Sequence, residues 1–92
     1  MNKKHLTVEQ CRAARAMLGW NQAQLAEAAN VSRQTIADFE RGAHMPIGNN
    51  LASIIAAFVK AGIDFIPENG GGAGVRFKKP VQGLRGGPDA QT

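Results

Sequence analysis

The sequence predicts a mainly α-helical domain of four helices, followed by a short β-hairpin and a flexible tail. Three observations predict this fold class. Apolar residues recur at helical spacing between Thr7 and Ala61, and capping and turn residues divide them into four runs. The period then changes to alternation in "IDFI" and "VRFK", on either side of the Gly-rich "PENGGGAG". The closing stretch "PVQGLRGGPDAQT" has little apolar surface to bury.

The first helix is predicted over residues 8–18. Thr7 is a suitable N-cap, and Gln10 stands three residues later at the returning position of a capping box. Gly19 follows the last turn, where a residue in the left-handed conformation commonly ends a helix. Residues 1–6 before it are expected to form a short polar lead.

The second helix is predicted over residues 22–29, with Asn21 as the N-cap and Gln24 at the capping-box position. Asn30 then interrupts the helix, because asparagine tolerates a positive φ better than other non-glycine residues. The side chains expected on its inward face are Leu25, Ala28 and Ala29.

The third helix is predicted to start after Ser32, to cover residues 33–41 and to stop at Gly42. The stretch "AHMPIGNN" is expected to be a loop, since Pro46 and Gly48 break helices. A fourth helix is predicted over roughly residues 50–61, with a wide apolar stripe, and Gly62 should end it.

These signals divide the chain into four parts. They are the polar lead over 1–6, the helical domain over 7–62, a β-hairpin extension over 63–79 and a flexible tail over 80–92.

Composition limits the classes of function. The 92 residues suffice for one small domain, and a net charge of +4 permits a polyanionic partner. The lone Cys11 cannot form an internal disulfide, and no apolar run approaches the ~18 residues of a membrane span, so we expect a cytoplasmic protein without a membrane partner. No carboxylate pair, metal-ligand cluster or nucleophile–base set is evident, so we expect no catalytic residues, no cofactor and no metal.

The second and third predicted helices fit a helix-turn-helix unit, in which two short helices cross at a tight turn. The close crossing requires a small residue in the middle of the first helix, and Ala26 stands there. Asn30 occupies the turn position where glycine is usual. The apolar residues expected to fill the angle between the helices are Leu25, Ala29, Val31, Ile36 and Phe39.

The stretch "NQAQLAEAANVSRQTIADFERG" resembles the Cro/cI-type, or XRE, family of phage and bacterial helix-turn-helix regulators, and the likeness extends over residues 8–62. The stretch "LASIIAAFVKAGIDFIPENGGGAGVRFKK" is similar to the ending of short bacterial regulators of this type. The resemblance implies a lambda-repressor-like four-helix domain that binds double-stranded operator DNA.

In such a motif the N-terminal residues of the second helix reach base edges in the major groove. The resemblance places Arg33, Gln34 and Asp38 at base-reading positions: arginine suits guanine, glutamine suits adenine, and Asp38 either accepts from cytosine or orients its neighbours. It also implies that Glu40 points inward and pairs with Arg15. The expected phosphate contacts are Gln22, Ser32, Thr35, Arg41 and Asn49, with His44 and Asn50 as weaker candidates. The alternative for the polar residues is an ordinary solvated face.

The function expected from these features is sequence-specific regulation of transcription, as a repressor that acts as a homodimer on two half-sites. The exposed side of the fourth helix or the hairpin could form the dimer surface, with "VRF" as an edge strand open to pairing. The alternative is an antitoxin-type regulator that binds a protein partner through the hairpin over 63–79 and the tail.

Overall fold

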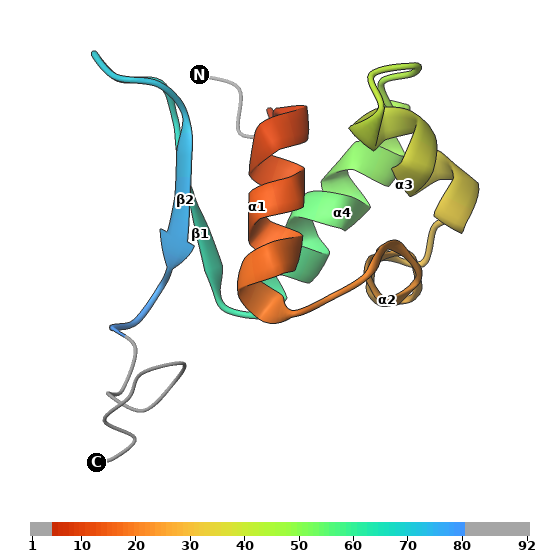
Figure 1. Cartoon of the computed structure of the whole chain (residues 1–92), viewed down its shortest axis with the longest axis horizontal. Coiled ribbons are helices and arrows are strands. Elements are labelled where there is room, and N and C mark those ends of the chain that lie inside the picture. The colour runs from red at the N-terminus through yellow and green to blue at the C-terminus, as the bar shows by residue number, and fades with distance from the viewer. Residues whose placement is uncertain (1–4, 81–92) are drawn as a thin grey trace.

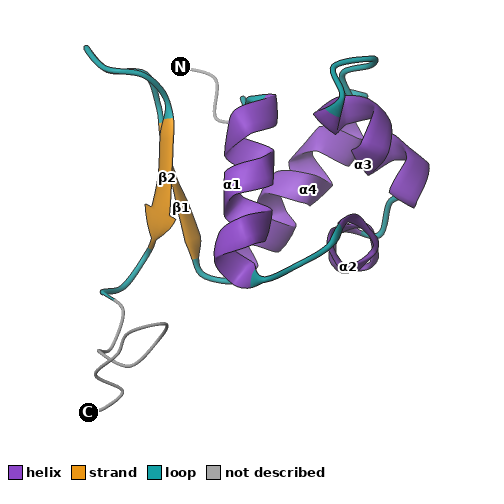
Figure 2. Cartoon of the chain, viewed as in Figure 1, coloured by secondary structure: helices purple, strands orange, loops and turns teal. Residues whose placement is uncertain are grey.

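The computed structural model describes residues 5–80 and shows four helices followed by a two-stranded antiparallel hairpin, which confirms the predicted fold class. The elements are α1 (Val8–Leu18), α2 (Gln22–Ala29), α3 (Arg33–Glu40), α4 (Gly48–Lys60), β1 (Ile63–Ile66) and β2 (Gly74–Phe77). In Figures 1 and 2, α1 and α4 lie between the hairpin on one side and the α2–α3 pair on the other. Most of the predicted tail, residues 81–92, lies outside the described part of the chain.

The caps predicted for α1 and α2 are present. Thr7 and Gln10 form both hydrogen bonds of a capping box, and Gly19 ends α1 with φ 71° and ψ 26°. Asn21 and Gln24 form the same box at the start of α2. Local hydrogen bonds of this kind satisfy the free N–H groups of a first turn, so each helix start is determined by a few neighbouring residues.

The bounds of three elements differ from the prediction. Helix α4 begins at Gly48, so Gly48 is its first residue rather than a helix breaker, and Asn49 lies in its first turn rather than in a loop. Glycine is tolerated there because the first N–H groups of a helix make no intrahelical bonds and the position lies at the helix edge. Helix α3 ends at Glu40, one residue early, with Arg41 as its C-cap. Strand β2 runs from Gly74 to Phe77, one residue before the expected 75–78.

The core collects side chains from every helix and from β1. Leu6 is 1% exposed and belongs to this core, so the chain before α1 is not wholly polar as predicted. Ala28 is exposed, and Ala26 instead joins the inward face of α2. Trp20 packs against the core, stacked on Phe58 with the ring centroids 5.9 Å apart. The buried apolar residues are Leu6, Cys11, Ala14, Leu25, Ala26, Ala29, Ile36, Phe39, Ile54, Ala57, Phe58 and Ile63.

The hairpin is attached to the helices by its apolar face and by one buried amide. Ile63 pairs with Phe77, and Phe65 pairs with Val75, so these four apolar residues share a face as predicted. The Nε2 of Gln10, a residue 5% exposed, donates to the carbonyl of Gly74 at 2.8 Å. The same Nε2 is 3.5 Å from the carbonyl of Ile66. One glutamine therefore closes the α1 cap and fastens the hairpin.

Candidate nucleic-acid interface

The turn between α2 and α3 holds the two helices in a helix-turn-helix arrangement. Asn30 has φ 57° and ψ 45°, the left-handed conformation expected of it. The N–H of Val31 donates to the carbonyl of Ala26 at 3.0 Å, and the hydroxyl of Ser32 caps α3 by accepting from the N–H of Thr35 at 3.0 Å. Ile36 and Phe39 are buried against α2, so the opposite side of α3 is left for solvent or a ligand.

The exposed side of α3 brings two of the three expected base-reading residues together. The Nε2 of Gln34 donates to Oδ1 of Asp38 at 2.8 Å. The Nη2 of Arg41 donates to the same oxygen at 2.9 Å. Arg33 is also exposed, and its side chain makes no hydrogen bond or ion pair with residues 5–80. The start of α3 therefore presents one free guanidinium and one oriented amide.

Two hydroxyl groups lie beside these residues at the start of α3. The oxygens of Ser32 and Thr35 are 2.8 Å apart, and either group can be the donor. Whichever donates, the other keeps a hydrogen that it can offer to an acceptor such as a phosphate oxygen. Both expected phosphate contacts are thus compatible with the capping role of Ser32.

Glu40, at the end of the same helix, faces inward and is 3% exposed. The Nε of Arg15 lies 2.8 Å from its Oε2, and the Nη2 lies 2.7 Å from its Oε1. The ion pair that the resemblance implies is therefore present, and it connects α1 to α3. The Nη1 of Arg15 donates to the carbonyl of Trp20 at 3.0 Å, which fixes the guanidinium on its other side.

Two further donors complete the surroundings of the Glu40 carboxylate. The thiol of Cys11 lies 3.1 Å from Oε2, and the Nε2 of Gln22 lies 3.1 Å from Oε1. Burial would raise the pKa of Glu40, but the hydrogen bonds from Arg15, Cys11 and Gln22 outweigh it and leave the pKa below its ordinary value. Burial, and then the bond to Glu40, raises the pKa of the Cys11 thiol, so this cysteine stays protonated.

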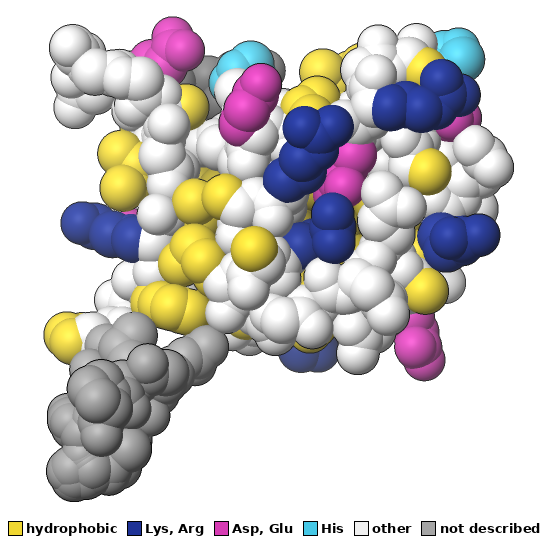
Figure 3. Space-filling model, in the orientation of Figure 1, with side chains coloured by type: hydrophobic (Ala, Val, Ile, Leu, Met, Phe, Trp, Pro, Cys, Tyr) yellow, Lys and Arg dark blue, Asp and Glu magenta, His cyan; other side chains and the backbone are white. Residues whose placement is uncertain are grey.

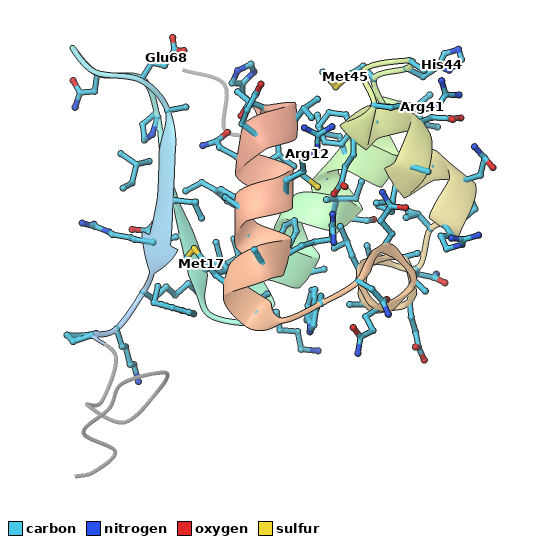
Figure 4. All side chains as sticks on the ribbon, viewed as in Figure 1. Arg12, Met17, Arg41, His44, Met45 and Glu68 are labelled. Atoms are coloured by element: carbon cyan, nitrogen blue, oxygen red, sulfur yellow. The ribbon has the colours of Figure 1, made fainter. Side chains whose placement is uncertain are left out.

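The start of α4 lies at the end of the loop that follows α3. No side chain caps this helix, because the N-cap position is Ile47 and makes no side-chain hydrogen bond. The expected contacts Asn49, Asn50 and His44 have no side-chain hydrogen bond with residues 5–80. Figure 4 shows His44 and Arg41 projecting at this end of the molecule. Free N–H groups, amides and a nearby cation form a polar surface suited to an anion.

Sequence reasoning missed part of this arrangement. Arg12 was not expected to take part, but its Nη2 donates to the main-chain carbonyl of Glu40, and Figure 4 shows it directed from α1 toward α3. The bond of Cys11 was also missed, although Cys11 lies one helical turn from Arg15 and so shares its face. The contact between Arg41 and Asp38 has a signal in its i, i+3 spacing. The contact of Arg12 has no comparable signal, because it depends on how α1 crosses α3.

Positive charge on the surface is distributed unevenly between the helices and the hairpin. In Figure 3 the Lys and Arg side chains on the visible face lie mainly over the helical part and toward α3, with fewer over the hairpin.

No group of three or more His, Cys, Asp or Glu residues within 5–80 is arranged to hold a metal ion. Among these described residues, no helix is long and apolar enough to cross a membrane.

A helix-turn-helix family model matches residues 12–63, more than half of the chain. The matched segment contains most of α1, the whole α2–turn–α3 unit and α4. No curated protein matches the chain. The chain therefore belongs to the XRE, or Cro/cI-type, family of helix-turn-helix DNA-binding transcriptional regulators.

Proposed function

We propose that this protein is a transcriptional repressor that recognises a specific double-stranded operator by placing α3 in the major groove. The observation that carries the proposal is the exposed side of α3, where Arg33 and Gln34 stand at the N-terminal end of the second helix of the motif. That end of the helix reaches base edges in helix-turn-helix proteins. A repressor needs only to occupy its operator, and residues 5–80 form a DNA-binding fold with one appended hairpin.

Arg33 and Gln34 are the proposed base contacts. The free guanidinium of Arg33 matches the O6 and N7 acceptors of guanine, and an amide matches the N6 and N7 atoms of adenine. Asp38, the third expected base-reading residue, lies one turn further along and contacts Gln34. Its carboxylate could accept from cytosine N4, or it could act through Gln34.

The proposed phosphate contacts surround this end of the molecule. Gln22 stands at the first position of α2 and bonds to Glu40 through Nε2, which leaves its second N–H and its Oε1 for other partners. The uncapped start of α4 offers main-chain N–H groups next to Asn49. The proposed set is Gln22, Ser32, Thr35, Arg41 and Asn49, with His44 and Asn50 as secondary candidates.

We further propose that the protein binds its operator as a homodimer. A domain of this size makes few base contacts, and a second copy on a neighbouring half-site doubles them. Strand β2 supports this proposal because the described sheet has two strands only, so each strand is paired on one side. Light scattering coupled to size exclusion should show a dimer at micromolar concentration, and a strict monomer that binds single half-sites would contradict this part.

An antitoxin-type role is the second candidate, and the position of the hairpin favours it. The hairpin is fastened to α1 by Gln10 and lies on the side of the molecule away from α3 (Figure 1). A protein bound to residues 63–79 would therefore leave α3 free for DNA. Co-expression with the product of a neighbouring gene should yield a stable complex that dissociates when Asp64 and Arg76, the outward-facing ion pair of the hairpin, are replaced.

Selection of binding sites from a random pool of DNA duplexes tests the main proposal. The protein should enrich one motif, and Arg33→Ala should lower affinity for that motif about tenfold or more, with lost preference at a G·C pair. Lys60→Ala, at the exposed C-terminal end of α4, is the matched control for loss of one positive charge. Failure to enrich any motif, or equal losses in the two variants, would contradict base reading by α3.

A further inference from the structure

Asp38 is the centre of a small hydrogen-bonded group on the exposed side of α3. Its Oδ1 accepts from Gln34, one turn earlier on the helix, and from Arg41, the C-cap residue. Its Oδ2 has no hydrogen-bond partner within residues 5–80. The bonds from Gln34 and Arg41 lower the pKa of the Asp38 carboxyl, so it is charged at neutral pH. One carboxylate therefore determines the geometry of two residues proposed to touch DNA.

The first effect concerns the amide of Gln34. A carboxylate can only accept, so it holds the Nε2 side of the amide toward itself and repels the Oε1 side. Reversal of the amide would bring two oxygens together, and Asp38 therefore disfavours one of the two orientations. One Nε2 hydrogen and both lone pairs of Oε1 remain available to a base. The positions of the donor and the acceptor that Gln34 offers to a base edge are thus determined before DNA binds.

The second effect concerns Arg41. Its guanidinium lies 2.9 Å from the Asp38 carboxylate, and the side chains of Arg41 and Asp38 are 66% and 23% exposed. A phosphate that binds Arg41 must compete with this carboxylate, and Asp38 also repels the phosphate itself. Both consequences weaken binding that depends on charge alone, which is the kind of binding that any DNA sequence provides.

We propose that Asp38 is a specificity-determining residue that acts through its neighbours: it orients Gln34 for one base and weakens the hold of Arg41 on phosphate. This inference rests on the proposed function of α3. The inference differs from direct reading of cytosine by Asp38. If Asp38 acts through its neighbours, replacing it changes the base preference of Gln34 and the phosphate contact of Arg41, and not a preference for a G·C pair of its own. Asp38 controls two interactions: the contact of Gln34 with adenine and the contact of Arg41 with phosphate.

Asp38→Asn separates these possibilities, because asparagine keeps the shape but can donate as well as accept, so it tolerates both orientations of the Gln34 amide. We expect affinity for a random-sequence duplex to rise about two- to fivefold, in keeping with release of an exposed ion pair. The slope of log K against log salt should steepen by up to about 0.9, the value of one additional phosphate contact. Binding-site selection should show weaker preference at the same base pair that Gln34→Ala affects.

Two controls complete the experiment. Glu68→Gln removes an equal charge from the exposed hairpin connection, which Figure 4 shows far from Arg41, and it should leave the preference and the salt slope nearly unchanged. The double variant Asp38→Asn with Arg41→Gln should lose the gain in slope but keep the weakened preference. A preference lost at a G·C pair that Gln34→Ala leaves intact would overturn the inference in favour of direct cytosine reading.

An Asp38→Asn variant with the slope and motif of the unmodified protein would also overturn the inference, although the proposed function would stand. Lack of any enriched motif for the unmodified protein would overturn both. Thermal melting monitored by circular dichroism shows whether each variant is folded. Arg41→Gln alone provides a second measurement: it should change the salt slope less in the presence of Asp38 than in the Asp38→Asn background.

Discussion

Two carboxylates of α3, Asp38 and Glu40, are two residues apart in sequence and lie in opposite surroundings. Glu40 is 3% exposed and binds side chains of α1 and α2. The carboxylate of Asp38 binds only side chains of α3 and its C-cap, and the side chains that it contacts belong to exposed residues. The same chemical group therefore connects three helices at one position and joins two side chains at the surface of α3 at the other. The difference arises from helical geometry, because a step of two residues turns about 200° around the helix.

This contrast predicts that stability depends on Glu40 and its partners far more than on Asp38. A buried carboxylate that loses its cation remains charged without compensation, whereas an exposed one is solvated by water. DNA recognition should show the reverse dependence. Four changes, in order of decreasing effect on stability, test this division.

Arg15→Ala should give the largest loss. Removal of one partner from a buried ion pair costs about 3–5 kcal/mol, and we expect about 3 kcal/mol because Arg15 is 20% exposed. For a domain of this size that loss lowers the melting temperature by more than about 10 °C. Arg12→Ala is the matched control: it loses one bond to the carbonyl of Glu40, at about 1 kcal/mol. Equal melting temperatures for the two variants would remove the special role of the ion pair.

Glu40→Gln should change both the stability and its dependence on pH. The loss at neutral pH is about 2 kcal/mol, because the Arg15 guanidinium loses its anionic partner and the amide nitrogen cannot accept the hydrogen bonds that a carboxylate oxygen accepts. The folded-state pKa of Glu40 lies below its ordinary value of 4.5, so its contribution is complete above that pH and is lost as the pH falls through the folded pKa. Urea titrations between pH 3 and 7 should therefore show a flatter acid decline in Glu40→Gln. An unchanged acid decline would mean that Glu40 does not carry it.

Gln22→Ala should affect both regions, since Gln22 bonds to Glu40 and is also a proposed phosphate contact. We expect a loss of about 1 kcal/mol in the free energy of unfolding. DNA affinity should fall equally for the selected motif and for a random duplex, because phosphate contacts carry no sequence information. A fall confined to the selected motif would instead assign Gln22 to base reading. Gln24→Ala, at the exposed capping position of α2, is the control for stability alone.

Asp38→Asn should have the smallest effect on folding, with a melting temperature within about 3 °C of the unmodified protein. Its bonds join this half-buried carboxylate to exposed residues of one helix and its cap, and water replaces them on unfolding. A large drop in the melting temperature would show that the α3 surface also supports the fold. In that case the contrast with Glu40 would fail.

The sequence was sufficient for the features that depend on near neighbours. The capping boxes at Thr7 and Asn21 and the left-handed Asn30 follow from a few adjacent residues, so they could be predicted without knowledge of the fold. The start of α4 could not, because the breaker signals of Pro46 and Gly48 do not distinguish a helix edge from a loop. Ala28 was misplaced because alanine fits both faces of a short helix.

The candidate site shows the same limit. The polar edge of α3 follows from helical spacing, and the pairing of Arg15 with Glu40 was available through family resemblance. The bonds of Cys11 and Arg12 to Glu40 depend on how α1 crosses α3. They join residues more than 25 positions apart, and periodicity carries no information about such a crossing.

The amide of Gln10 has a consequence for where this protein can be divided. Gln10 precedes the segment that matches the family, and both carbonyls that it binds, those of Ile66 and Gly74, follow that segment. The segments before and after the matched region are thus joined to each other by hydrogen bonds of Gln10. A fragment restricted to residues 12–63 would lack Gln10, both carbonyls that it binds and the buried Leu6. We therefore expect these flanking segments to unfold together with the helices, as part of a folding unit longer than the segment by which the family is recognised.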